Sequence, residues 1–65
     1  MDAEFKNHLI RVARAYLRGN LYPHLEEIEF KSCLIGLYNL DVRAMNDIYS
    51  SAEDQEISSD LPLAI

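Results

Sequence analysis

Hydrophobic residues in the first part of the chain recur at the spacing of an α-helix. When residues are placed about 100° apart on a helical wheel, five apolar side chains fall within roughly one third of a turn. They are Phe5, Leu9, Val12, Ala13 and Tyr16. Gly19 and Asn20 follow, and both residue types tolerate the left-handed backbone that ends many helices. The pattern predicts an amphipathic helix over residues 3–18.

A second helix is predicted over residues 23–38. Pro23 suits a first helical turn, where its missing N–H would have no partner, and Glu26 and Glu27 complement the positive helix end. Apolar residues lie on two sides of this helix. One side carries Leu25, Ile28, Ser32 and Ile35, and the other carries Phe30, Cys33, Leu34, Leu37 and Tyr38. A helix that is apolar on two sides is normally sandwiched between neighbours.

This helix is the reason to expect self-association, because one copy of so short a chain has too few residues to cover both sides. We predict a homodimer whose interface is exposed in the monomer and covered in the dimer. The predicted interface residues are Phe30, Leu34, Leu37 and Tyr38.

A strand remains the alternative for residues 28–40, where apolar residues also alternate with a period of two. The acidic run that precedes them and the lack of a hairpin turn signal favour the helix. Gly36 weakens the helix near its end.

A short third helix is predicted over residues 41–50, with Asp41 as its cap. Its apolar stripe consists of Val42, Met45, Ile48 and Tyr49. From residue 51 the chain is serine-rich and acidic, which predicts a flexible tail over residues 51–65 that ends on the apolar Leu61, Leu63 and Ile65. The expected fold is therefore all-α: a helical hairpin plus a short third helix in residues 1–50, dimerising into a bundle, with a disordered acidic tail.

Charge is unevenly distributed along the 65 residues, which carry a net charge of −5. Residues 2–18 hold four bases and two acids, whereas residues 41–65 hold six acids and one base. The bases of the first helix include a stripe formed by Arg11, Arg14 and Arg18. This asymmetry favours pairing between a basic and an acidic part, within one molecule or between two, over binding of a polyanion.

The candidate chemistry argues against an enzyme, a metal site or a cofactor. His8 with Glu4, and His24 with Glu27, have helical spacing for two metal ligands, but surface histidines are the ordinary interpretation. Cys33 lacks a neighbouring base and is most simply a small buried hydrophobe. No glycine-rich phosphate loop is present.

Nucleic-acid binding is also disfavoured. The second and third helices could be drawn as a helix-turn-helix, but the third offers Arg43 and Asn46 beside Asp47 and an acidic tail. The arginine stripe is then a solvated face or a docking surface for an acidic protein. The tail is a solubilising terminus or a ligand for a basic groove.

The sequence thus predicts a small non-enzymatic regulatory or adaptor protein that acts by protein–protein interaction as a homodimer, with a larger unidentified protein as partner. The alternatives are a nucleic-acid-associated regulator that uses the arginine stripe, and an acidic inhibitor that mimics nucleic acid. No apolar run approaches the roughly 20 residues that span a bilayer, and the first residues lack a secretory pattern. With the lone Cys33, this predicts a cytoplasmic protein without membrane association.

Overall fold

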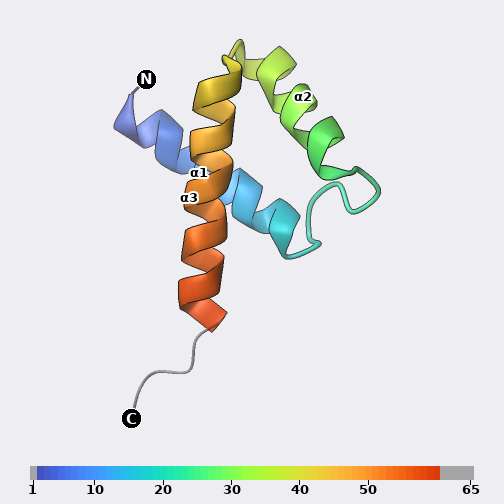
Figure 1. Cartoon of the computed structure of the whole chain (residues 1–65), viewed down its shortest axis with the longest axis vertical. Helices are drawn as coiled ribbons and strands as arrows, with labels where there is room; N and C mark the ends of the chain where they lie inside the picture. The colour runs from blue at the N-terminus through green and yellow to red at the C-terminus, as the bar shows by residue number, and fades with distance from the viewer. Residues whose placement is uncertain (1, 61–65) are drawn as a thin grey trace.

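The computed structural model describes residues 2–60, and three α-helices make up most of this range (Figure 1). They are α1 (Ala3–Leu17), α2 (Glu27–Tyr38) and α3 (Val42–Asp60). The described part of the chain contains no strand. The predicted all-α class is therefore confirmed, and the alternative of a strand over residues 28–40 is wrong.

Helix α1 ends where the sequence predicts. The N–H of Gly19 donates to the carbonyl of Tyr16, and the N–H of Asn20 donates to that of Ala15, each at 3.0 Å. These two bonds form the Schellman arrangement that satisfies the last carbonyls of a helix. Gly19 adopts the left-handed φ of 79° that this arrangement requires, at no steric cost because glycine has no Cβ.

Helix α2 begins later than predicted, since residues 23–26 are not helical. Pro23 instead follows the first residue of a turn closed by the N–H of Leu25 donating to the carbonyl of Tyr22 at 3.0 Å, which is a favoured place for proline. Glu26 then precedes the first helical residue, and its N–H donates to Oε1 of Glu29 at 3.0 Å. This hydrogen bond, from the residue before the helix to a side chain in its first turn, is half of a capping box and marks Glu27 as the start of α2.

Helix α3 is longer than predicted. Asp41 caps it as expected, because its Oδ1 accepts the N–H of Ala44 at 2.6 Å. However, the helix continues to Asp60 instead of ending near residue 50, so the predicted flexible tail is wrong for residues 51–60. Ala52 is fully buried and Glu56 bonds to α1, which offsets the entropy of ordering this segment. The apolar terminus, residues 61–65, lies outside the described residues.

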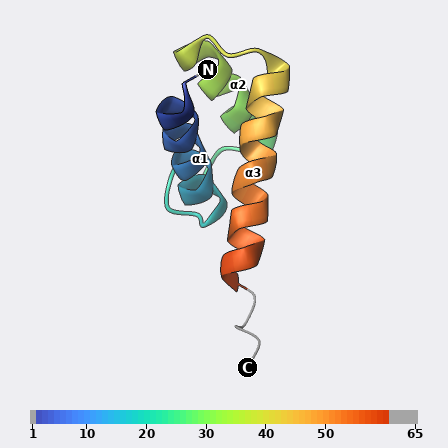
Figure 2. The ribbon, with the colours of Figure 1, turned by 90° about the vertical axis from the view of Figure 1, so that its left-hand side faces the viewer.

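Helix α3 is the element against which both other helices pack. Helix α1 crosses behind α3 at an angle in Figure 1, and in the view of Figure 2 the two neighbouring helices both descend from the top of the molecule. The first two helices do not form the predicted hairpin as the main packing unit, since each packs mainly on α3. Between themselves, α1 and α2 make ring contacts, such as Tyr16 stacked on Phe30 with centroids 4.1 Å apart. The core draws on all three helices: Leu9, Ile10, Ala13, Phe30, Leu34, Met45, Ile48, Tyr49 and Ala52.

Candidate functional site

The predicted dimer interface on α2 is divided between the core and the surface. Phe30 is 0% and Leu34 2% exposed, because α1 and α3 cover this side of α2 within a single chain. The prediction that these two residues form an exposed patch is therefore wrong. Leu37 remains 65% exposed, and Tyr38 is 36% exposed, with its ring edge-on to Phe5.

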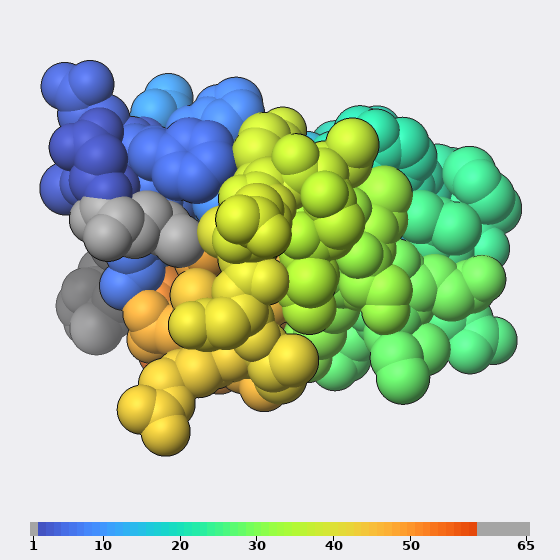
Figure 3. Space-filling view, turned by 90° about the horizontal axis from the view of Figure 1, so that it is seen from above, coloured from blue at the N-terminus to red at the C-terminus, as the bar shows by residue number. Residues whose placement is uncertain are grey.

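The opposite side of α2 borders an apolar groove of about 380 Å³ against α3. Ile28 is 72% exposed on this groove and Val42 64% exposed, whereas Met45 lies buried beside them. The remaining lining residues are Glu27, Lys31, Ser32, Ile35 and Asn46. Figure 3 looks onto the end of the molecule at which α2 turns into α3. We call the apolar groove formed by these lining residues the α2–α3 groove.

One edge of the α2–α3 groove is charged. Lys31 Nζ lies 2.8 Å from Oε2 of Glu27, one turn earlier, and 4.4 Å from the ring centroid of Tyr49. The hydrogen bond from Lys31 lowers the pKa of Glu27. Burial, followed by the negative charge of Glu27, raises the pKa of Tyr49 to about 12. At neutral pH this edge therefore presents the Glu27 carboxylate beside a neutral phenol.

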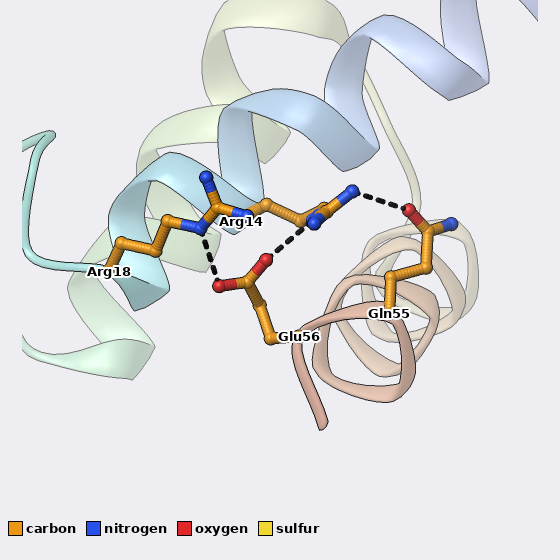
Figure 4. Close-up of polar contacts among 4 residues, drawn as sticks. All are labelled: Arg14, Arg18, Gln55 and Glu56. Carbon is orange, nitrogen blue, oxygen red and sulfur yellow. Dashed lines mark hydrogen bonds and ion pairs between the residues drawn. The ribbon is translucent and has the colours of Figure 1, made fainter. Parts of the chain in front are cut away.

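The predicted arginine stripe lies on α1, and two of its members bind α3 (Figure 4). Nε of Arg14 donates to Oε2 of Glu56 at 2.6 Å, and Nε of Arg18 donates to Oε1 at 2.7 Å. Arg14 also donates through Nη1 to Oε1 of Gln55 at 3.2 Å. Arg11, the third member, is exposed. We call the contact of Arg14 and Arg18 with Glu56 the arginine clamp.

The two ion pairs of the arginine clamp and a third, between Lys6 and Asp47, show that basic and acidic parts pair within one molecule. Nζ of Lys6 lies 2.6 Å from Oδ2 of Asp47, so this contact, like the clamp, joins α1 to α3. In the clamp, the hydrogen bonds from Arg18 and then from Arg14 lower the pKa of Glu56, which keeps its carboxyl ionised.

Sequence reasoning missed the clamp, although a signal for it was present. The stripe of Met45, Ile48 and Tyr49 continues at helical spacing through Ala52 to Glu56. That continuation indicates one helix face turned toward α1, with an acid at its far end.

The other candidate residues do not assemble a reactive centre within residues 2–60. His24 lies in the turn before α2, so it does not share a helix face with Glu27 as the spacing predicted. His8 is exposed on α1, and Cys33 is half-buried in α2. Among the described residues, no group of three or more histidines, cysteines or acids could hold a metal ion.

The described helices also include none that is long and apolar enough to cross a membrane. The chain matches no protein-family model, no curated protein and no solved structure, so its own surfaces carry the functional argument.

Proposed function

We propose that the protein is a small, non-enzymatic regulatory or adaptor protein that acts by protein–protein contact as a homodimer. The observation that carries this proposal is the α2–α3 groove, which leaves Ile28 72% and Val42 64% exposed around an apolar depression. Exposed apolar side chains gathered at a depression are typical of surfaces that another protein covers. The proposed interface is therefore on the Ile28 side of α2 and not, as the sequence predicted, on the Phe30 side.

The charges beside the groove favour a second copy as the occupant. Glu27 and Lys31 lie one turn apart on the same flank of α2. If a second α2 lies antiparallel, a two-fold axis between these positions places Glu27 of each copy opposite Lys31 of the other. Such a self-complementary pattern is what an isologous interface requires.

The proposal is tested by sedimentation of the wild-type chain, Val42→Asp and Leu37→Asp over a range of concentrations. Asp at the first position of α3 is compatible with the positive helix end, so Val42→Asp should stay folded and become monomeric. Leu37 is also exposed but lies outside the groove, so Leu37→Asp, which makes the same charge change, should still dimerise. Circular dichroism confirms that each variant is folded.

Two results would reject the proposed interface. One is a wild-type chain that stays monomeric at every concentration. The other is a dimer that survives Val42→Asp but is lost with Leu37→Asp, which would place the contact on the Leu37 and Tyr38 surface.

A further inference from the structure

The arginine clamp has the geometry of a carboxylate-binding site. Arg14 lies in the last turn of α1 and Arg18 is the residue that follows the helix, and each uses its Nε to bind a different oxygen of the same carboxylate, at 2.6 and 2.7 Å (Figure 4). Guanidinium groups recognise carboxylates through such charge-assisted bonds, which are directional as well as strong. The α1 surface therefore already binds one acidic side chain supplied from a helix.

That acidic side chain lies on the least anchored part of α3. Among the α3 side chains described up to residue 58, Ala52 is the last buried one, and Ile57 is 60% exposed. Between Ala52 and Ile57, Gln55 and Glu56 join α3 to α1 through polar contacts, of which the Arg14–Glu56 bond is partly buried and the Arg14–Gln55 bond is exposed. A terminal segment with little apolar burial belongs to the part of a fold that opens most easily. Glu56 can therefore leave the two arginines without disturbing the core.

Space for a larger acidic group lies beside the clamp. A hollow of about 190 Å³ is lined by Arg11, Arg14, Ala15, Arg18 and Asn20. Arg11 is exposed and extends the row of guanidinium groups by one helical turn. An incoming segment with acids at helical spacing could thus contact all three arginines, whereas Glu56 contacts two.

We infer that the arginine clamp is a binding site for an acidic helical segment of a partner protein, which displaces Glu56. The exchange replaces one carboxylate with another, so the pairing of the arginines is conserved. A carboxylate is favoured over the phosphates of a nucleic acid, because Arg14 and Arg18 already hold one carboxylate between them at 2.6 and 2.7 Å. This inference rests on the proposed adaptor function, because it gives the adaptor a second surface that binds a partner protein.

The test compares binding of an octaglutamate peptide to the full-length wild type, Glu56→Gln and Asp54→Asn by titration calorimetry. Replacing the Glu56 carboxylate, one of the groups that compete for the two arginines, should tighten binding to Glu56→Gln by roughly tenfold, since more of the protein is then competent to bind. Asp54→Asn makes the same charge change at an exposed neighbour and should leave the affinity close to that of the wild type. Adding Arg14→Gln to Glu56→Gln should abolish the gain.

Nuclear magnetic resonance keeps the test decisive if Glu56→Gln loses structure. Saturating octaglutamate should shift the Hε signals of Arg14 and Arg18 in the wild-type chain while the core signals stay in place. Equal affinities for Glu56→Gln and Asp54→Asn would overturn the inference, because net charge alone would then explain binding. Tighter binding of a DNA duplex than of octaglutamate at the same salt would also overturn it.

The two proposals fail separately. Monomeric Val42→Asp that still binds octaglutamate would uphold the clamp site independently of the dimer. A wild-type dimer in which Glu56→Gln gains no affinity would retain the proposed homodimer and reject the clamp site.

Discussion

The division of α2 into a buried and an exposed side predicts unequal effects of two similar substitutions. Phe30 is 0% exposed and stacks on Tyr16, whereas Ile28 is 72% exposed. Truncation of a buried phenylalanine to alanine costs about 3–5 kcal/mol. Burying a whole isoleucine side chain is worth about 1.5–3 kcal/mol, and Ile28 is only 28% buried, so Ile28→Ala should cost about 0.4–0.8 kcal/mol.

Compared with the expected stability of the chain, the cost of Phe30→Ala is large and the cost of Ile28→Ala is small. At about 0.05–0.15 kcal/mol per residue, a 65-residue domain has a free energy of unfolding of roughly 3–10 kcal/mol. Phe30→Ala should therefore remove a third or more of the stability, or unfold the chain entirely. Phe30→Leu keeps most of the volume and should cost less than Phe30→Ala, which leaves a measurable transition.

The assay is urea denaturation followed by far-ultraviolet circular dichroism, at a dilution at which the chain is monomeric. Dilution is needed because a dimer that covers Ile28 would add to the apparent cost of Ile28→Ala. The expected order of destabilisation is Phe30→Ala, then Phe30→Leu, then Ile28→Ala. Equal destabilisation by Ile28→Ala and Phe30→Ala in the monomer would refute the assignment of the two sides.

Three further predictions concern polar groups. The pKa of Glu56 lies below its ordinary value of 4.5, so the clamp stabilises the fold fully above pH 4.5, and this stabilisation is lost as the pH falls through the lowered pKa. Helical signals of residues 53–58 should therefore weaken first on acidification. The pKa of Tyr49 is raised from 10.0 to about 12, so its stabilising effect is complete below pH 10 and disappears as pH rises toward 12, which ultraviolet titration of Tyr49 against Tyr49→Phe would follow. Asp41→Ala removes the cap of α3 and should lower the free energy of unfolding by about 1 kcal/mol in thermal denaturation. Asp54→Ala, an exposed position within the same helix, is the comparison and should change it little.

Local signals in the sequence predicted the helix ends that depend on local bonds. Gly19 and Asn20 ended α1 where expected, because the Schellman bonds involve nearby residues. Pro23 misled the start of α2, since proline is equally favoured after the first residue of a turn and in a first helical turn. Tyr22 has a positive φ of 48°, which is compatible with the turn and not with a helix. A tyrosine gives no sequence signal for that conformation.

The length of α3 could not be predicted locally, because distant residues determine it. Glu56 binds Arg14, which lies 42 positions earlier in the chain. The charge asymmetry predicted that basic and acidic parts would pair, but not which residues would meet. The wrong interface has a similar cause, because the helical wheel of α2 identified both apolar sides, whereas contacts from distant residues such as Tyr16 and Tyr49 determine which side the chain itself covers.

The two proposed surfaces are far enough apart to work independently on one helix. Val42 at the groove and Glu56 at the clamp are 14 residues apart on α3, or about 21 Å at the helical rise of 1.5 Å per residue. Substitutions separated by more than about 7–10 Å, without shared partners, usually have additive effects. Val42→Asp and Glu56→Gln should therefore add in their effects on stability, and octaglutamate affinity should be the same in Glu56→Gln with and without Val42→Asp. A clear departure from additivity would mean that α3 transmits a change from one end to the other, so that dimerisation and partner binding are coupled.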